Sequence, residues 1–595
     1  MTQTEPRPHV AAFFKRLLPW LAAIGSGILL RGGYAPFEDG EVAWLALVPL
    51  LIALRFAPQR RAFGLGFVSG LVFWGGSLTW LWKLTENGGP WPLVILGYSF
   101  LAAYCALYTA AFAALAAPLW RMRPTSGSSE ATPPTPPPAA ANVWHDLARA
   151  IAASALWVGL ELVRSRFLTG FAWNHLGVSQ IGNRSILQLA SLGGVYAVSA
   201  AVMLFNVTVA NIAVRIWQSS RRLIPARRHW DLMIVLALLV AAFYWGLGEM
   251  RRFERLAAGG PRMMVAAVQP NAPSIFERDT LGEVQVLQRL ANHSQLVAVS
   301  RPDLLVWPET SLLGTVPLDI DAMNFAHQIA MLVKAPLLVG ATEGIDPISE
   351  EGLPADIANA SWLFAPDGSI AARYRKQHLV PFGEYIPLDR WFPRLKRLSP
   401  IGFSCVAGTG NALMPVAIRD SARVGDSGGG RVGTLPQPAT DTADAAEATA
   451  AEEAAEATTD VLISPLICFE DTVSELSRRA VRDGAGLLVN QSNDAWFGGS
   501  SEGRQHHAQA ILRAVENRTP LMRCANAGVS GMIDAVGRSS EPSDFFAVPV
   551  SPRGTDWPIA PYTRWGDWLL AWPCFAFLLW HAARLWHSAR RTGRG

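Results

Sequence analysis

Long apolar runs dominate the first 250 residues of this 595-residue chain and constrain its fold more than any other feature. Residues 91–120, for example, contain no Asp, Glu, Lys or Arg. A helix needs about 20 such residues to cross the roughly 30 Å hydrocarbon core of a bilayer. We predict eight membrane spans, at 12–31, 42–57, 63–83, 91–120, 148–164, 186–214, 231–248 and 565–583. The fifth is the weakest because it carries Glu161.

The overall composition agrees with a membrane protein. Hydrophobic residues make up 50% of the chain, charged residues only 16%, and the mean hydropathy is +0.21. Many of the 23 Trp residues lie near the ends of the apolar runs, where aromatic rings favour the membrane interface. The small net charge of +4 gives no reason to propose a nucleic-acid partner.

The distribution of Lys and Arg predicts the orientation in the membrane, because short cytoplasmic loops are enriched in these residues. Basic clusters precede the first run, separate the second from the third and the sixth from the seventh, and follow the eighth. With eight spans these clusters share one side, so both termini are predicted to be cytoplasmic. Arg251, Arg252 and Arg255 oppose this arrangement but are outnumbered.

The region between the seventh and eighth runs has the composition of a globular domain and is predicted to lie outside the cytoplasm. Short apolar segments typical of buried strands alternate there with helical patterns. The predicted strands lie at 263–271, 303–310, 335–343, 461–468 and 485–492, with a hairpin over 360–376. This alternation favours an α/β domain with a mixed sheet. We therefore predict a membrane domain at 1–250, a catalytic domain at 262–555 and a last span with its tail at 565–595.

Two segments are predicted to be disordered. Residues 123–145 are predicted to form a linker in a cytoplasmic loop, and the first part of this linker is rich in Pro, Ser and Ala. Residues 419–460 are first rich in Gly and then rich in Ala and acidic residues. Neither segment holds enough large apolar side chains to form a core.

Three polar residues lie at the ends of predicted strands, where sites form at the rim of an α/β sheet. Cys468 ends one strand and precedes a helical pattern, whose start would favour a thiolate. Glu309 follows another strand and could exchange a proton with a thiol. Lys376 could stabilise an oxyanion. Each residue also has a purely structural explanation: Cys468 as a buried cysteine, Glu309 as a turn residue and Lys376 as a surface cation. Their spacing in the sequence does not show that the three side chains are close in space.

Four motifs carry a resemblance: "VWPET", "YRKQHLVPFGEYIP", "LICFED" and "NQSNDAWFG", in that order. Together they resemble the nitrilase superfamily, which implies an α-β-β-α sandwich with a Glu-Lys-Cys triad. The predicted spans narrow this resemblance to the apolipoprotein N-acyltransferase family, and residues 167–180 and 511–537 are also similar to that family. The resemblance covers nearly the whole chain except residues 123–145 and 419–460.

The resemblance implies a role for individual residues. Glu309 becomes the proton acceptor, Lys376 the oxyanion-side lysine and Cys468 the nucleophile. Glu384 matches a second glutamate that supports the lysine. Phe469 and Glu470 follow the nucleophile, and some relatives carry Tyr where this chain has Phe469.

The implied activity is a ping-pong acyl transfer without a cofactor or metal. A phospholipid, phosphatidylethanolamine, would acylate Cys468, and the α-amine of an S-diacylglyceryl cysteine on an apolipoprotein would accept the chain. The resemblance places such an enzyme, as a monomer, in the bacterial inner membrane, with its catalytic domain in the periplasm. Two alternatives remain: a membrane-anchored amidase for a small amide, and a transporter or scaffold with an inactive nitrilase-like domain.

Other polar residues point to no further site. His506 and His507 are adjacent and so lie on different helix faces, and no HExxH motif is present, which disfavours a metal site. The sequence leaves open whether Cys405 and Cys524 form a disulfide.

Overall fold

A computed structural model describes residues 8–120, 139–221, 229–272, 280–348, 354–387, 391–392, 394, 404–419, 458–540 and 544–592. The chain forms two compact units. We call the first, which comprises Met1–Met250, Trp496–Glu516 and Ala560–Gly595, the helical unit. The second, Arg251–Ala495 with Asn517–Ile559, is called the α/β unit.

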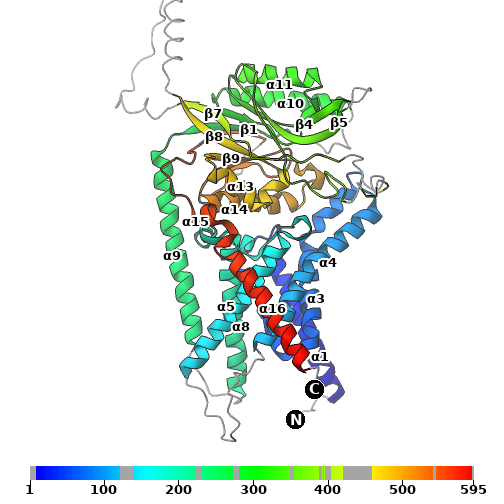
Figure 1. Ribbon diagram of the computed structural model, residues 1–595, viewed down its shortest axis with the longest axis vertical. Coiled ribbons are helices and arrows are strands. Elements are labelled where there is room, and N and C mark those ends of the chain that lie inside the picture. Colours follow the sequence, from blue (N-terminus) through cyan, green and yellow to red (C-terminus); the bar gives the residue numbers. More distant parts are fainter. Residues whose placement is uncertain are drawn as a thin grey trace, which may run out of the picture. The chain divides into compact units, whose positions relative to one another are not determined.

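Long apolar helices build the helical unit (Figure 1). They are α1 (Pro8–Gly32), α2 (Val48–Phe56), α3 (Ala62–Ser77), α4 (Trp91–Ala116), α5 (Ala139–Arg164), α8 (Val195–Ser220), α9 (Trp230–Gly259, which continues into the α/β unit) and α16 (Ala571–Thr592). Helix α3 packs between α1 and α4, and α5 packs between α8 and α16.

Four helical segments among the described residues are long and apolar enough to cross a membrane: Trp91–Trp120, Val195–Ser220, Trp230–Gly259 and Pro561–Arg590. The helices Gln59–Ser77 and Thr79–Thr85 are bent by 49° relative to each other, and they make a fifth candidate span if they are counted as one. Val42–Phe56 is apolar but shorter. The predicted membrane character of the chain is therefore confirmed, whereas eight spans remain a prediction.

Two boundaries predicted from the sequence are wrong. The apolar run 186–214 is not one helix: it contains part of α6 (Arg184–Leu187), all of α7 (Ala190–Gly193) and most of α8. Gly194 has a φ of 68°, which breaks the helix before α8 begins. The predicted linker is shorter than 123–145, because α5 begins at Ala139. Its residues 123–138 lie outside the described residues.

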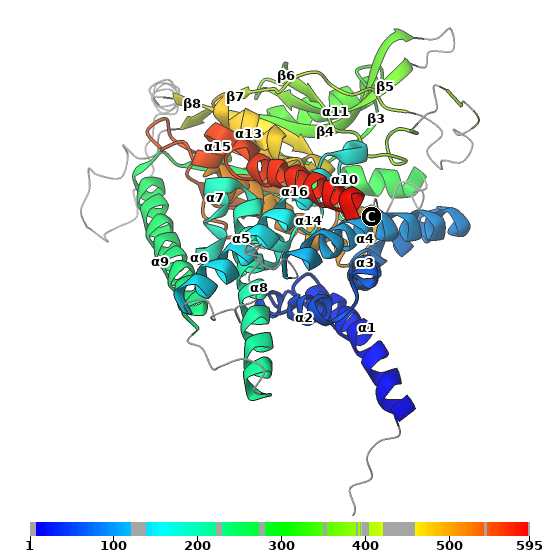
Figure 2. The ribbon, with the colours of Figure 1, turned by 60° about the horizontal axis from the view of Figure 1, so that its bottom comes forward.

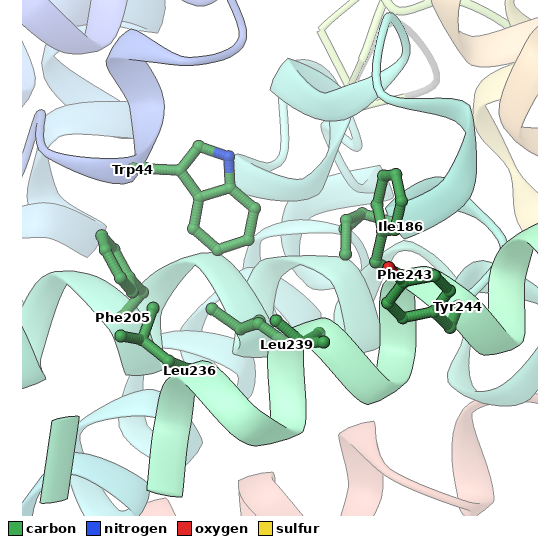
Figure 3. A pocket seen from close by; sticks show the side chains of 8 residues that line it. Trp44, Ile186, Phe205, Leu236, Leu239, Phe243 and Tyr244 are labelled. Carbon is green, nitrogen blue, oxygen red and sulfur yellow. The ribbon is translucent and has the colours of Figure 1, made fainter. Parts of the chain in front are cut away.

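Helix α9 lies at the edge of the helical unit, away from α1, α3 and α4 in both views (Figures 1 and 2). Only 17% of its most apolar window is buried. An open apolar groove of about 450 Å³ runs beside it, lined among others by Trp44, Phe205, Leu236 and Phe243 (Figure 3). A helix that is apolar on its uncovered faces is stable in hydrocarbon and not in water. This exposure agrees with a lipid environment around α9.

The α/β unit contains two sheets. The first has the order β12-β1-β2-β4-β5-β6, and β3 also pairs with β4. Its strands are β1 (Met263–Val268), β2 (Leu304–Val306), β3 (Leu312–Val316), β4 (Leu337–Ile348), β5 (Pro354–Phe364), β6 (Ile370–Arg375) and β12 (Phe545–Val550). The second has the order β11-β10-β9-β8-β7. Its strands are β7 (Met414–Arg419), β8 (Thr458–Ile467), β9 (Leu487–Ser492), β10 (Leu521–Ala525) and β11 (Gly531–Ile533).

The two sheets pack face to face, and helices cover their outer faces (Figure 1). Buried side chains from both sheets, such as Val265, Val416 and Met522, form the core between them. Helices α10 (Thr280–Ala298) and α11 (Ile320–Val333) cover the first sheet through Leu290 and Ile329. Helix α13 (Ser474–Arg482) contacts β8 of the second sheet. The predicted α-β-β-α sandwich is confirmed.

The ends of the predicted disordered insert belong to two paired strands. Arg419 ends β7 and Thr458 begins β8, and these residues are partners in an antiparallel register. Residue 419 and residues 458–460 are therefore strand residues, contrary to the prediction for 419–460. Residues 420–457 lie outside the described residues.

Candidate active site

Cys468 lies at the sharp turn where β8 ends. It is the first residue of η9 (Cys468–Thr472), a five-residue 3-10 helix that precedes α13. The predicted helix start beside the thiol is therefore a short turn and not the first turn of α13. Cys468 has a φ of 52°, a left-handed conformation that costs a non-glycine residue about 1–3 kcal/mol unless its surroundings enforce it. The residue is partly exposed and also packs against the core between the sheets.

Lys376 follows β6 directly and is only 1% exposed. Its backbone N–H donates to the carbonyl of Asn359 at 2.8 Å, which continues the pairing of β6 with β5. The Nζ atom lies 2.9 Å from Glu384 Oε1 and 3.5 Å from Glu309 Oε1. Burial alone would lower the pKa of Lys376, but Glu384, Glu309 and the nearby Cys468 raise it well above its ordinary value. The amine therefore stays protonated and donates hydrogen bonds.

Glu309 and Glu384 reach Lys376 from different directions. Glu309 follows β2 in the segment Trp307–Pro308–Glu309 and is 7% exposed. Glu384 lies in the loop that begins at Lys376, and its Oε2 accepts the backbone N–H of Val380 at 2.9 Å. The two carboxylates thus share one buried ammonium group, and each is held by its own segment.

Asn359 of β5 is a site residue that the sequence did not indicate. Its Nδ2 donates to Glu309 Oε1 at 2.7 Å and to Glu384 Oε1 at 2.8 Å. One amide group therefore fixes the separation of the two carboxylates around Lys376. The only available signal was a single Asn between apolar neighbours in "IANASWLF".

Glu470 connects the Cys468 turn to the Lys376 loop. Its carboxylate is fully buried and accepts the backbone N–H groups of Ile467 at 2.8 Å and Gln377 at 2.7 Å, and the hydroxyl of Tyr374 at 2.9 Å. Burial raises the pKa of Glu470, although these backbone donors and Lys376 oppose the shift. This carboxylate orders both loops, which is a structural contribution to the site.

Phe469 stacks on His378 of the same loop, with ring centroids 5.9 Å apart and an interplanar angle of 22°. With this contact all six predicted residues, namely Glu309, Lys376, Glu384, Cys468, Phe469 and Glu470, lie in one connected region of the α/β unit. Glu309 and Lys376 both come just after strands, and both are buried.

The remaining cysteines of the α/β unit are free thiols. Cys524 is buried in β10, and Cys405 is partly buried beside Glu384, whose carbonyl accepts the Cys405 N–H at 2.7 Å. Burial raises the pKa of each thiol to about 12. The disulfide that the sequence left open is not formed, because Cys405 and Cys524 are both free thiols. His506 and His507 lie in α14 (Glu502–Asn517), where the ring of His506 packs against Trp173.

Comparison with known proteins places this site in a family. Residues 26–208 match the model of the apolipoprotein N-acyltransferase N-terminal domain, and residues 264–541 match that of the carbon-nitrogen hydrolases. An apolipoprotein N-acyltransferase of Geobacter metallireducens is 31% identical over 572 residues, which cover 94% of this chain and 93% of the relative. One of Azotobacter vinelandii is 30% identical over 587 residues, with 97% and 96% covered.

A solved structure, that of the nitrilase-superfamily member Nit3 of Saccharomyces cerevisiae, matches with 18% identity and a TM-score of 0.32, covering 49% of this chain and 91% of that one. The near full-length match to the bacterial relatives extends over both the helical and the α/β unit. This chain therefore belongs to the apolipoprotein N-acyltransferase family and is an acyltransferase.

Proposed function

We propose that this enzyme transfers the sn-1 acyl chain of a phospholipid to the N-terminal amine of S-diacylglyceryl apolipoproteins, through a thioester on Cys468. The observation that carries the proposal is the buried ammonium of Lys376, which is shared by Glu309 and Glu384 close to a partly exposed thiol. A fixed cation and a carboxylate beside a thiol supply what acyl transfer needs: a base, a nucleophile and an oxyanion partner.

In the first half-reaction Glu309 takes the proton of the Cys468 thiol, and the thiolate attacks the ester carbonyl of the lipid. A C–S bond forms, and Lys376 stabilises the oxyanion of the tetrahedral intermediate. The C–O bond to the glycerol oxygen then breaks, and Glu309 returns the proton to that oxygen. A lysophospholipid leaves, and the acyl chain remains on Cys468 as a thioester.

In the second half-reaction the α-amine of the diacylglyceryl cysteine attacks the thioester carbonyl. Glu309 takes a proton from the attacking amine, Lys376 again stabilises the oxyanion, and the C–S bond breaks. The proton passes from Glu309 to the departing thiolate, which restores the thiol. Throughout, Glu384 holds the ammonium of Lys376, and Asn359 donates to both Glu384 and Glu309, so the ammonium and the two carboxylates keep their relative positions.

The direct test supplies purified enzyme in phospholipid vesicles with a lipidated peptide that carries an N-terminal S-diacylglyceryl cysteine. We expect an N-acylated peptide and an equal amount of lysophospholipid by mass spectrometry. A matched peptide with an acetylated α-amine should receive no acyl chain. If the free-amine peptide were not acylated while a small amide was hydrolysed, the chain would instead be an amidase.

The proposed membrane arrangement has eight spans, cytoplasmic termini and a periplasmic domain from 262 to 555 in the bacterial inner membrane. It is supported by the apolar helices and by the Lys and Arg clusters. In this arrangement both lipid substrates present their reactive groups at the membrane surface while their chains stay in the bilayer. We further propose phosphatidylethanolamine as the acyl donor and a monomer as the active form.

Reporter fusions test this topology. We expect a reporter that folds only in the periplasm to be active when inserted near residue 440, and inactive at the C-terminus. A reporter that folds only in the cytoplasm should give the opposite pattern. Cytoplasmic activity of the fusion near 440 would overturn both the orientation and the argument that the site meets its lipids on the periplasmic side.

Replacing Glu309 with Gln is expected to slow thioester formation by about 10²–10⁴-fold, because proton transfer to a positioned base typically contributes this much. The measurement is the rate at which Cys468 gains acyl mass from phospholipid. Glu343→Gln is the control, since Glu343 of β4 is also a buried carboxylate but pairs with Arg373 and Arg375 and not with Lys376. Equal slowing in both variants would assign the effect to altered folding.

Replacing residues 423–456 with a short Gly/Ser linker is expected to retain most of the acyl transfer activity. The flanking strands β7 and β8 pair directly at Arg419 and Thr458, so a short connection can close the hairpin. The composition of the segment also contains few residues that could bury apolar surface. Loss of peptide acylation with an unchanged unfolding temperature would show that the segment takes part in substrate binding.

A further inference from the structure

Three neighbouring parallel strands, β8, β9 and β10, bring polar residues together behind the Cys468 turn. Leu466 of β8 is in register with Asn490 of β9, and Asn490 is in register with Arg523 of β10. Asn490 and Arg523 are both completely buried. Asn490 is the first residue of the "NQSNDAWFG" motif, and Arg523 lies outside the four motifs. The steps proposed above for Glu309, Lys376 and Cys468 use neither residue, so their contacts need a separate explanation.

Asn490 contacts the backbone of the nucleophile itself. Its Nδ2 donates to the carbonyl oxygen of Cys468 at 3.1 Å and lies 3.4 Å from that of Leu466. Cys468 is the residue with the left-handed φ of 52°, so this bond fixes the peptide that follows the strained position.

Arg523 contacts the oxygen of the Asn490 side-chain amide. Its Nη1 donates to Asn490 Oδ1 and lies 3.3 Å from Asp471 Oδ2, in the same η9 turn as Cys468. Its Nη2 donates to Asp494 Oδ2 at 2.8 Å, and its Nε donates to the carbonyl of Val529 at 3.0 Å. The guanidinium is thus held by three buried side chains, Asn490, Asp471 and Asp494, and by the carbonyl of the partly buried Val529.

The chemistry of these groups determines how the amide is oriented. A guanidinium has only donors, so it must face the oxygen of Asn490 and not its NH₂ group. The NH₂ group then necessarily faces the Cys468 carbonyl. We propose that Arg523 is a positioning residue, which acts through Asn490 and Asp471 to hold the Cys468 turn in the conformation that presents the thiol. This inference rests on the proposed role of Cys468 as the nucleophile.

The sharpest test is Asn490→Asp, which keeps the shape of the side chain and an acceptor for Arg523 but removes the donor to the Cys468 carbonyl. Two rates are measured on the purified full-length chain: alkylation of Cys468 by iodoacetamide across a pH series, and acyl transfer from phospholipid vesicles to Cys468. We expect both to fall by about 10–10²-fold, because a displacement of about 1 Å at a reacting group can cost 10²-fold. The lipid KM should be unchanged, and the pH midpoint of alkylation should shift.

Two further variants separate positioning from folding. Arg523→Lys keeps a cation between Asp471 and Asp494 but cannot reproduce the planar fork that also reaches Asn490, so it should show a smaller loss of the same kind. Asn517→Asp is the matched control: this asparagine is also fully buried, and its Nδ2 donates to Ser477 of α13 and not to the Cys468 turn. It should leave the reactivity of Cys468 unchanged.

The outcomes are distinct. Wild-type alkylation and acylation rates in folded Asn490→Asp and Arg523→Lys would overturn the inference. An equal loss in Asn517→Asp would also overturn it, because the effect would then be one of general stability. If wild-type enzyme gained no acyl mass at all, the proposed function would fail, while the alkylation rates would still decide whether Arg523 and Asn490 position the thiol.

Discussion

Replacing Cys468 with Ala is expected to abolish both thioester formation and acylation of the lipidated peptide. Wild-type enzyme incubated with phospholipid and no acceptor should gain the mass of one acyl chain, located on Cys468 and released by hydroxylamine. The variant should gain none, because it lacks the proposed nucleophile, and burial raises the pKa of Cys405, the other partly exposed thiol near Lys376, to about 12. Intact-mass measurement before and after hydroxylamine provides the readout.

Two comparisons sharpen this experiment. Cys468→Ser should be nearly as inactive, because a hydroxyl is far less acidic than a thiol and Glu309 cannot easily activate it. Cys105→Ala, which removes a buried thiol of α4, should acylate at the wild-type rate. Transfer by Cys468→Ala at the wild-type rate would mean that the reaction does not pass through a cysteine thioester.

Replacing Lys376 with Met is expected to lower the acyl transfer rate by about 10²–10³-fold, the usual effect of removing one oxyanion partner. It should also lower the free energy of unfolding by about 3–5 kcal/mol, because the buried Glu309 and the partly buried Glu384 would both lose their cation. Denaturant unfolding of the purified enzyme, measured beside single-turnover acylation, reports both quantities.

A double variant separates these two effects. Lys376→Met combined with Glu384→Gln removes one of the two unpaired carboxylates, so most of the lost stability should return. The acyl transfer rate should stay low, since no ammonium group is restored. Recovery of the rate together with the stability would show that Lys376 serves only to neutralise the buried carboxylates.

The sequence predicted where the candidate site residues lie along the chain, each just after a strand, but not how the strands are arranged in the fold. Glu309, Lys376 and Cys468 each follow a strand, and local apolar patterns are sufficient to place them there. The three side chains come close together only because segments far apart in the sequence pack against one another. Glu309 and Lys376 follow strands of the first sheet, whereas Cys468 follows a strand of the second. Only the resemblance of four ordered motifs brought them together in advance.

Residues inside strands were harder to predict. Asn359 and Arg523 interrupt apolar segments, and a buried polar group there is stable only because distant segments supply its partners. No local pattern contains those partners. The break at Gly194 was missed for a similar reason: an apolar run has the same composition whether it forms one helix or three.

The pairing of β1 with β12 has a consequence for how such a chain can arise. These strands are the first and last of the α/β unit, and they lie side by side, with Met263 opposite Val550. A folded module whose two ends are adjacent can be inserted into a host protein at a single loop without separating the flanking host segments. An α/β core whose ends are adjacent can be joined to a membrane protein at one position, and here Trp496–Glu516 is the one segment between those ends that belongs to the helical unit.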